Sequence, residues 1–481
     1  MADDRKRFRP TWAWEEGDMR ALGYRVIDDI VDHHLGLRSK PVSRRKPRSH
    51  YDSLFAGPPP REGANPVEVL RLVEDHILTG IAHTDHPRFF GYVPSPGNYV
   101  SVLGDALASG FNVFAGHCLV GSSAAAIEAT TLGWLRDLVG FPASSGGIFL
   151  SGGSMSGLSA LHTARTAAVG RAGHDRDLVV YGTDETHSSL AKALRILGFH
   201  AKQFRRVATD DGLAMAPQAL IPAIQSDSSQ GLRPFAVLAT AGTTSTGAID
   251  PFVELRRICD AHGLWLHVDG AYGAAACLVA EARSKLSGME LADSLVLDPH
   301  KWWFQPYEIG CLLVRDQRLL KAAFAVAAEY LREAAAAGAA DGEGLAGDIN
   351  FYDFGPQLTR SFRALKLWMF FKTFGVDAIG RAVTKGIDLA ERTEELISAS
   401  PDWEIVTGAQ LGILTFRCLR PEGRARAAIT EAVDRLLADG FALITTTEVR
   451  GETVFRACPI HPDACIDDVS RSLELLATYI K

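Results

Sequence analysis

The sequence predicts an α/β fold built around a mostly parallel sheet. Short apolar or β-branched runs alternate with helical patterns from about residue 86 onwards. Strands that are separated by helices of this length pair in parallel, and helices then cover both faces of the sheet. The chain has 481 residues, more than the roughly 250–300 that a single hydrophobic core serves, so we expect more than one domain. The strand-like runs are residues 148–150, 178–181, 235–240, 265–268, 294–297 and 311–314.

An N-terminal helical segment, residues 1–85, precedes this pattern. Apolar side chains recur in it at three- to four-residue spacing from residue 16 to residue 36, while aspartates occupy the other face. This spacing predicts an amphipathic helix. Prolines and basic residues follow at positions 39–49, which indicates a solvated linker or, alternatively, a basic patch for an anionic partner.

A large α/β part, residues 86–375, and a smaller α/β part, residues 376–481, make up the rest of the chain. Helical patterns at residues 156–169, 188–197 and 252–261 separate the strands of the large part, and one long helix is expected around residues 351–380. In the small part the pattern indicates strands near residues 403–406, 411–418, 441–446 and 452–458, and helices near residues 422–439 and 466–480.

Composition argues against several classes of partner. Acidic residues number 57 and basic residues 50, which gives a formal charge of −7, whereas nucleic-acid-binding proteins are more often basic. No apolar run reaches the about 18 residues that cross a bilayer, so we expect no membrane partner. The seven cysteines are scattered and no pair has CxxC spacing. We therefore expect reduced thiols in a cytoplasmic protein, and no metal site.

Lys301 gives the strongest local signal for chemistry. It follows the apolar run 294–297, within the motif Asp298-Pro299-His300-Lys301-Trp302. Ligand and catalytic groups of open parallel sheets lie at the carboxyl ends of strands, and lysine is seldom buried without a role. Burial would disfavour the ammonium form, as a lysine that forms a Schiff base requires. A lysine that merely extends its ammonium group to solvent is the alternative.

Asp269 ends a second strand-like run and shares one face of that strand with His267, two residues before it. A buried carboxylate needs a cation or several hydrogen-bond donors as partners. The protonated ring nitrogen of pyridoxal phosphate is one such partner. A helix cap or a pairing with arginine is the alternative.

Three further strand ends carry polar residues that fit the same pocket. Gly152, Gly153 and Ser154 form a turn from strand into helix, and such a turn presents backbone N–H groups to a phosphate. His187 is placed to stack on a flat cofactor ring, and Thr240 ends another run. Each of these residues alone also reads as a helix cap or a polar turn. Their occurrence at successive strand ends favours a cofactor site.

The motifs that hold these residues resemble the group II pyridoxal-phosphate-dependent decarboxylases, the family of aromatic-L-amino-acid, histidine and glutamate decarboxylases. The similarity runs from about residue 16 to the end of the chain, and the aromatic amino acid branch matches best. The Pro-His-Lys-Trp and His-Val-Asp-x-Ala-Tyr motifs are the most specific for the family. The matching segments are residues 86–95, 151–154, 186–189, 239–244, 267–272, 298–302 and 362–368.

The resemblance implies the aspartate-aminotransferase-like (type I) fold, with a seven-stranded, mostly parallel sheet. It also implies pyridoxal 5′-phosphate as cofactor and a homodimer with active sites at the subunit interface, interlocked through the N-terminal helical segment. Lys301 would hold the cofactor covalently, Asp269 would keep its ring nitrogen protonated, and His187 would lie against the ring. The remaining implied contacts are Gly153, Ser154 and Asp298 to the phosphate, Thr240 and Ala271 to the ring, His300 beside the site, and Ser95, Tyr92, Phe89 and His187 to the substrate.

Tyr330 bears on the reaction type within this resemblance. Family members have a mobile loop whose tyrosine protonates the substrate Cα after carbon dioxide leaves, and members with phenylalanine there tend to form an aldehyde instead. Tyr330 lies at the expected distance after Lys301, ahead of a stretch rich in alanine and glycine. This position favours decarboxylation of an aromatic L-amino acid to the amine and carbon dioxide. A tyrosine that packs an ordinary helix is the alternative.

The substrate and the reaction type stay open on the sequence alone. An aromatic-rich neighbourhood favours an aromatic substrate. Residues 115–128, however, depart from the family pattern near the side-chain pocket, so a non-aromatic amino acid stays an alternative substrate. An aldehyde synthase, an aminotransferase or a desulfurase would share the fold and cofactor. The sequence places no arginine for a substrate carboxylate and no cysteine at residues 320–350. A non-catalytic protein of the same fold would not need Lys301 and Asp269. The aromatic residues are Phe89, Tyr92, Trp302, Trp303 and Phe304.

Overall fold

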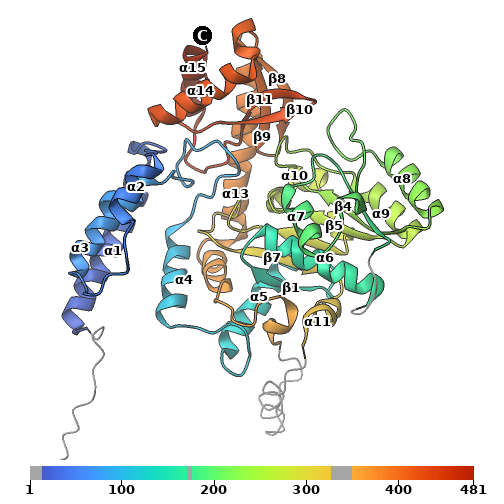
Figure 1. Cartoon of the computed structure of the whole chain (residues 1–481), viewed down its shortest axis with the longest axis horizontal. Coiled ribbons are helices and arrows are strands. Elements are labelled where there is room, and N and C mark those ends of the chain that lie inside the picture. The colour runs from blue at the N-terminus through green and yellow to red at the C-terminus, as the bar shows by residue number, and fades with distance from the viewer. Residues whose placement is uncertain (1–13, 171–175, 327–348, 481) are drawn as a thin grey trace, which may run out of the picture.

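The large sheet has seven strands in the order β1-β7-β6-β5-β4-β2-β3 (Figure 1). The structure is a computed structural model that describes residues 14–170, 176–326 and 349–480. All neighbours pair in parallel except β7, which is antiparallel to both β6 and β1. The mostly parallel, seven-stranded sheet is therefore confirmed. Its strands are β1 (Gly146–Leu150), β2 (Leu178–Gly182), β3 (Phe204–Arg206), β4 (Arg233–Thr240), β5 (Trp265–Asp269), β6 (Ser294–Leu297) and β7 (Gly310–Val314).

Burial on both faces explains why these apolar runs form strands. Every residue of β2, β6 and β7 is buried. Alternate residues of β2 enter different cores: Leu178 and Val180 pack in one apolar cluster, and Val179 and Tyr181 pack in another. The pattern does not predict β3, because this edge strand is three residues long and none of its residues is buried.

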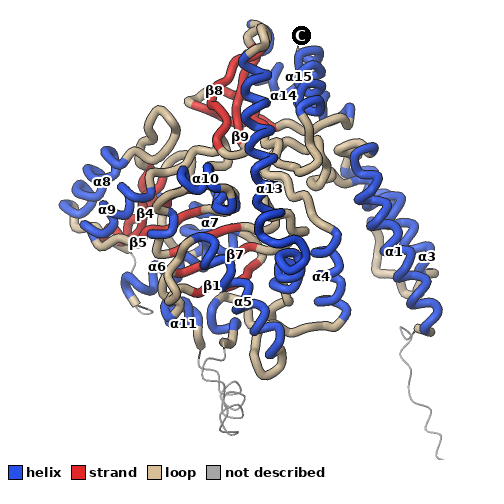
Figure 2. The backbone as a smooth tube through the Cα atoms, turned by 180° about the vertical axis from the view of Figure 1, so that it is seen from behind, coloured by secondary structure: helices blue, strands red, loops and turns tan. Residues whose placement is uncertain are grey.

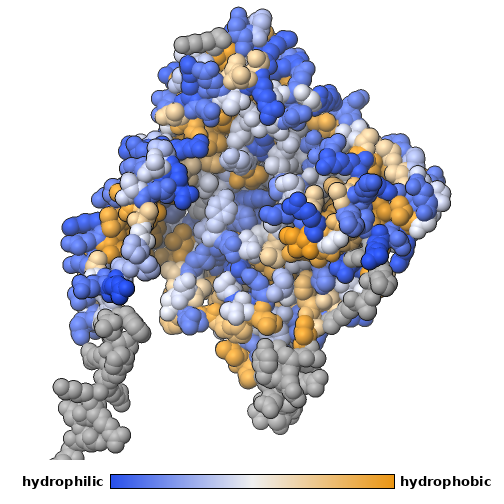
Figure 3. Space-filling model, viewed as in Figure 1, coloured by the Kyte–Doolittle hydropathy of each residue, from blue (hydrophilic) through white to orange (hydrophobic). Residues whose placement is uncertain are grey.

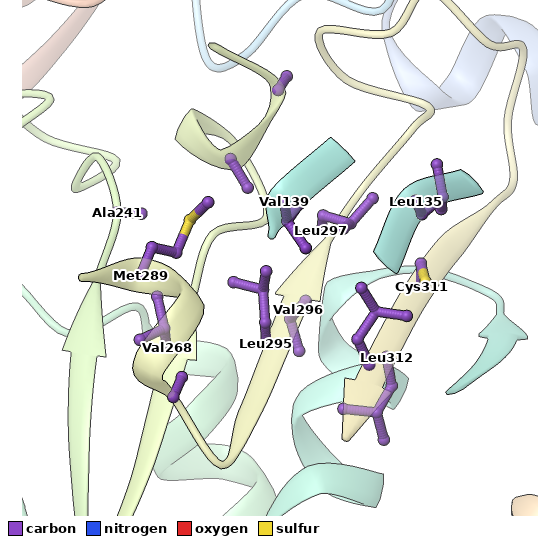
Figure 4. Packing of buried hydrophobic residues seen from close by; sticks show 14 of the residues in the cluster. Leu135, Val139, Ala241, Val268, Met289, Leu295, Val296, Leu297, Cys311 and Leu312 are labelled. Carbon is purple, nitrogen blue, oxygen red and sulfur yellow. The ribbon is translucent and has the colours of Figure 1, made fainter. Parts of the chain in front are cut away.

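Helices cover both faces of the large sheet (Figure 2). α6 packs against β1 and β4–β7, whereas α8 and α9 pack against β4. Figure 4 shows Leu295, Val296 and Leu297 of β6 in the middle of the core, between β5 and β7. The helices of this part are α4 (Tyr99–Gly110), α5 (Ser122–Val139), α6 (Gly153–Val169), α7 (Ser188–Ile196), α8 (Pro217–Ser229), α9 (Phe252–His262), α10 (Ala280–Lys285) and α11 (Arg318–Phe324).

The C-terminal part contains a four-stranded sheet in the order β10-β11-β9-β8, in which every pair is antiparallel. The predicted strands and helices are present here, with shifts of a few residues at their ends. A separate apolar core, with Trp403, Phe416 and Phe455, lies under this sheet. The elements are β8 (Trp403–Gln410), β9 (Ile413–Cys418), α14 (Arg426–Asp439), β10 (Thr445–Val449), β11 (Glu452–Ala457) and α15 (Ile466–Tyr479).

The long helix differs from its prediction. α13 begins at Ala364 and ends at Ser398, and residues Phe351–Phe354 form a separate 3-10 turn. Within α13, Gly375 has φ 74° and ψ 159°, a conformation that suits glycine and interrupts the helix. The prediction of one helix over 351–380 is thus wrong at its start and too short at its end. The division of the chain at 85/86 and 375/376 stays a prediction.

The N-terminal segment lies to one side of both sheets (Figure 1). It contains α1 (Glu16–Gly36), α2 (Arg48–Phe55) and α3 (Pro66–Leu72), so the predicted first helix is present with its expected bounds. No residue of α1 is buried, and Figure 3 shows apolar side chains on the surface of this segment. In the part of the chain that the structure describes, no helix meets the length and hydropathy of a membrane span.

A buried ion pair links three distant segments next to β1. Glu128 of α5 is 0% exposed and receives a two-pronged contact from the guanidinium of Arg360, which is 2% exposed. Arg360 also donates to Ala115 O and Phe149 O at 2.9 Å each, and Glu128 Oε1 accepts Phe149 N at 3.1 Å. The pair therefore fixes the end of β1, just before the Gly152–Gly153 turn.

Arg360→Met should leave Glu128 as an unpaired buried carboxylate. Because loss of one partner of a buried pair typically costs ~3–5 kcal/mol, we expect a much lower urea midpoint or aggregation on expression. Combining Arg360→Met with Glu128→Gln removes the unpaired charge and should regain a large part of the loss. Equal stability of the single variant and the wild type would show that the pair does not hold the fold.

Candidate active site

The carboxyl ends of five strands meet at one edge of the large sheet. Only β7 in this sheet runs against the others, so β1, β2, β4, β5 and β6 all end on the same side. The register places Thr240 of β4 opposite Asp269 of β5, and Asp269 opposite Val296 of β6. Lys301 follows β6 in a turn closed by Lys301 N donating to Asp298 O at 2.9 Å. The predicted residues at these strand ends are thus brought together.

Lys301 is paired with a carboxylate. Its Nζ lies 3.0 Å from Oδ2 of Asp298, and its side chain is 26% exposed. Burial acts to lower the pKa of Lys301, but the carboxylates of Asp298 and Asp269 outweigh burial, and the pKa is raised. Burial thus acts on Lys301 in the direction that the sequence predicts, but the two carboxylates, which the sequence argument did not include, reverse the net shift of its pKa.

The turn after β1 forms an open N-terminus on α6. Gly152 has φ 140°, and a Cβ on Gly152 would lie 2.9 Å from Cε1 of His300. A Cβ on Gly153 would lie 2.7 Å from Oδ2 of Asp298, so only glycine lets these segments approach. Ser154, the next residue, is exposed. This is the geometry that binds a phosphate at a helix N-terminus.

Asp298 sits against that helix N-terminus with an unused acceptor. The residue is 4% exposed, and its Oδ1 is a buried atom with no hydrogen-bond partner among the described residues. A buried polar atom without a partner is uncommon and indicates a missing donor or ligand. The glycine-lined turn fits a phosphate-bearing group, and the orphaned oxygen of Asp298 fits a hydrogen-bond donor beside Lys301.

Asp269 is half-buried, and its Oδ1 accepts a hydrogen bond from Ala271 N at 3.1 Å. His267, on the same face of β5, is completely buried, and its Nδ1 lies 2.8 Å from Oγ of Ser294. Burial lowers the pKa of His267 to about 4. The imidazole is therefore neutral at physiological pH and leaves Asp269 without a neighbouring cation on this strand.

Asp250 is a supporting residue that the sequence patterns do not indicate. Its Oδ2 accepts Thr240 N at 2.7 Å, and its Oδ1 accepts Met215 N at 2.6 Å. Burial raises the pKa of this carboxyl to about 6. Asp250 fixes the backbone of Thr240, which is 6% exposed. Its position ten residues after Thr240 gives no periodic signal.

His187 caps α7, directly after the turn that follows β2. Its Nδ1 lies 2.7 Å from Oγ of Ser189 and accepts Ser189 N at 3.3 Å. The imidazole itself is exposed. His187 is therefore a helix-capping histidine, as the alternative interpretation predicts. Stacking of its imidazole on a cofactor ring stays a prediction, and the exposure of the imidazole is compatible with it.

Three of the four predicted substrate residues lie on one segment, residues 86–95, but they differ in accessibility. Ser95 is 4% exposed, with Oγ in contact with His300 O and 3.2 Å from Gln305 O. Phe89 is 3% exposed and packs with Val42 and Leu443. Tyr92 is 67% exposed. The roles of all three toward a substrate stay predictions.

Arg456 of β11 is a buried arginine that the sequence alone does not place near the site. Its Nη1 donates to Tyr92 O at 2.6 Å and its Nε donates to Thr244 O at 2.7 Å. Its Nη2 is buried and has no hydrogen-bond partner among the described residues. Arg456 thus ties the segment that contains Tyr92 and the turn after β4 to the small sheet. Only the folded chain brings these positions together.

Three aromatic residues that supported an aromatic substrate are core residues: Trp302, Trp303 and Phe304, of which Phe304 is 5% exposed. Trp302 and Trp303 are 0% and 1% exposed. Trp302 stacks on Tyr272 with ring centroids 5.0 Å apart, and Trp303 meets Phe371 edge-on. The sequence argument from an aromatic-rich neighbourhood is wrong for these residues, because their side chains enter the core.

The unusual segment 115–128 packs on residues beyond the long gap in the described chain. His117 is 7% exposed and stacks on Tyr352 with ring centroids 5.6 Å apart. Cys118 N donates to Oδ1 of Asn350 at 3.1 Å. Tyr330, the predicted proton donor, lies outside the described residues.

The fold and this edge of the sheet fit one class of protein: an enzyme that binds a phosphate-bearing cofactor at the carboxyl ends of parallel strands. The comparisons with known proteins agree. The pyridoxal-dependent decarboxylase conserved domain matches residues 59–419. An aromatic-L-amino-acid decarboxylase of Bacillus atrophaeus is 42% identical over 456 residues, covering 94% of this chain and 93% of the relative. The chain belongs to the pyridoxal-dependent decarboxylase family.

Solved structures of plant enzymes share the whole fold. Oryza sativa TDC with PLP and tryptamine superposes with a TM-score of 0.90 at 28% identity, covering 98% of this chain and 99% of the other. A 4-hydroxyphenylacetaldehyde synthase of Rhodiola rosea has a TM-score of 0.87 at 26% identity, with coverage of 97% and 98%. The family therefore includes both amine-forming and aldehyde-forming relatives of this chain.

His267 gives the stability of the cofactor-free protein a definite pH dependence. Its pKa is about 4 in the fold against 6.5 in the unfolded chain. The contribution of His267 to the free energy of unfolding is fully present above pH 6.5 and is lost as the pH falls toward 4. Over this range the unfolded chain binds a proton on the imidazole, whereas the folded chain does not. His267→Gln should shrink the change in unfolding free energy between about pH 7.5 and about pH 5 by about 2 kcal/mol.

Urea unfolding at both pH values measures this change. His262→Gln is the matched control, because His262 is exposed on α9, and it should keep the wild-type pH dependence. An unchanged pH dependence in His267→Gln would mean that this imidazole is not held neutral by burial.

Proposed function

We propose that this chain decarboxylates aromatic L-amino acids to the amine and carbon dioxide, with pyridoxal 5′-phosphate held on Lys301. The observation that carries the proposal is the meeting of Lys301, Asp269 and the N-terminus of α6 at one sheet edge. The aromatic substrate is supported by the 42% identity to the Bacillus atrophaeus aromatic-L-amino-acid decarboxylase. The aromatic side chains of Trp302 and Trp303 lend it no support.

Each residue of the edge has a distinct task in this proposal. When bound, the cofactor supplies a sink for the electrons of the bond between Cα and the carboxylate. Asp269 holds the proton on the ring nitrogen, and Lys301 holds the cofactor covalently. Gly153 and Ser154, at the positive end of α6, bind the phosphate through backbone N–H groups. His187, Thr240 and Ala271 fix the plane of the ring, which orients the bond that breaks.

The proposal includes a homodimer in which the N-terminal segment packs on a second copy. Large apolar side chains on α1 and α3 are exposed in the single chain: Tyr24 is 61% exposed, Leu35 82% and Leu72 50%. Large apolar side chains exposed on neighbouring helices are typical of a surface that packs on a partner. A second copy of the chain would cover it and bring its own residues to the site edge.

Lys301 should carry the cofactor. Reduction of the cofactor-loaded protein with borohydride followed by peptide mass mapping should find the pyridoxyl adduct on Lys301, because this lysine alone follows β6 at the sheet edge in the described chain. Lys366, which is buried and bonded to Asp105 at 2.9 Å, serves as the internal comparison and should be unmodified. An adduct on another lysine, or none after loading, would refute the proposed site.

Tyr330 should decide between amine and aldehyde. Incubation with L-tyrosine, L-tryptophan or L-phenylalanine should yield the amine with one carbon dioxide released per substrate. Tyr330→Phe keeps the ring and removes the phenolic proton, so its amine output should fall and, in air, aldehyde, ammonia and peroxide should appear. An amine output equal to the wild type would show that another group protonates Cα. Aldehyde from the unaltered protein would favour the aldehyde-synthase alternative.

A further inference from the structure

Three side chains that can bind a metal converge where α1 meets the segment before residue 86. His33 lies on α1, whereas His83 and Asp85 lie two residues apart on that segment. One ligating atom of each residue lies within 4.8 Å of those of the other two. Among residues 14–170, 176–326 and 349–480, no other group of three His, Cys, Asp or Glu side chains has this spacing. The sequence prediction of no metal site rests on cysteine spacing, which does not address such a group.

The contact between His33 and Asp85 does not by itself require a metal. His33 Nε2 lies 2.7 Å from Oδ2 of Asp85, which is an ordinary hydrogen bond or ion pair. His83 is the residue that this pair leaves unexplained. Its ring centroid lies 5.2 Å from that of His33, and its Nδ1 is a buried atom with no hydrogen-bond partner among the described residues. A buried nitrogen without a partner indicates a missing donor or ligand.

Backbone hydrogen bonds hold His83 and Asp85 in a fixed turn. His83 N donates to Val42 O at 2.8 Å. His83 O accepts a hydrogen bond from His86 N at 3.0 Å, which closes the turn that contains Asp85. α1 then brings His33 to this turn. Ligands that a rigid backbone already holds close together lose little freedom when they bind an ion.

A cavity of about 770 Å³ adjoins the three side chains and gives an ion and its water access to them. His33, His83 and Asp85 are each only half-buried, so their side chains can rotate toward a common centre. The charged residues that share the cavity wall are balanced toward negative charge, with three acidic and two basic residues besides the group itself: Asp29, Asp32, Glu74, Lys40 and Arg44.

Two imidazoles and one carboxylate form a donor set that suits zinc and related divalent transition metals. Ligand atoms around a tetrahedral zinc ion lie about 3.4 Å apart. This spacing falls between the 2.7 Å that separates His33 from Asp85 and the 4.8 Å limit of the group. We propose that His33, His83 and Asp85 bind one Zn²⁺ ion, with water from the cavity as the fourth ligand.

The ion fastens α1 to the body of the molecule. No residue of α1 is buried, so burial of apolar surface in the single chain does little to hold this helix. An ion that binds the folded chain and not the unfolded one stabilises the fold. Here it joins α1 to the turn that leads into residues 86–95. The site is independent of the proposed function, because none of its ligands belongs to the cofactor site.

Zinc retention by the cofactor-loaded protein tests this site. After treatment with a chelator, addition of ZnCl2 and gel filtration, elemental analysis should find one more zinc per chain in the wild type than in His83→Ala or Asp85→Asn. Each variant should bind Zn²⁺ more than about 100-fold more weakly, since loss of a residue that merely supports a ligand already costs about 10- to 100-fold. His50→Gln is the matched control and should keep the zinc, because His50 is exposed on α2.

Two further measurements use the same proteins without an activity assay. Zn²⁺ should raise the thermal unfolding midpoint of the wild type and of His50→Gln, but not that of Asp85→Asn. Co²⁺ in place of Zn²⁺ should give the visible absorption of a four-coordinate site, which His33→Gln should abolish. A wild type that retains no zinc would overturn the proposal, as would equal retention by the wild type and Asp85→Asn. If His83→Ala does not fold, Asp85→Asn and His33→Gln decide the outcome.

Discussion

The candidate site depends on the direction of the strands in the large sheet, where β7 is the one antiparallel strand, between β1 and β6. Because β7 alone in the large sheet runs against its neighbours, the other six strands end on the same side, and the residues that follow β1, β2, β4, β5 and β6 share one edge. The hydrophobic burial of β2, β6 and β7 on both faces holds that edge rigid. Asp269, Lys301 and the Gly152–Gly153 turn then need no further device to meet.

The charged groups at this edge of the sheet act on one another. Asp298 and Asp269 raise the pKa of Lys301 against the effect of burial, while burial keeps His267 and His300 neutral. In the cofactor-free site the ammonium of Lys301 is paired with Asp298, and the carboxylate of Asp269 acts on it without direct contact.

The sequence predicts those features of the fold that depend on residues close together along the chain. The strands of the large sheet, the turn into α6 and the motif around Lys301 were predictable, because each depends on residues that are close along the chain. Pairings across long separations were not: Glu128 with Arg360, Thr240 with Asp250, and Arg456 with Tyr92. The direction of Trp302 and Trp303 was equally hidden, since neighbours in sequence can face the core or the site.

The most direct test of the account is the turnover of Asp269→Ala, measured as carbon dioxide release from an aromatic L-amino acid by protein whose Lys301 adduct has been verified. The account predicts that this variant folds and loads the cofactor but loses far more than tenfold in kcat, because nothing else on β5 holds the ring-nitrogen proton: His267 is neutral and buried. A variant that keeps more than about a tenth of the wild-type kcat, a loss under ~1.4 kcal/mol, would contradict it.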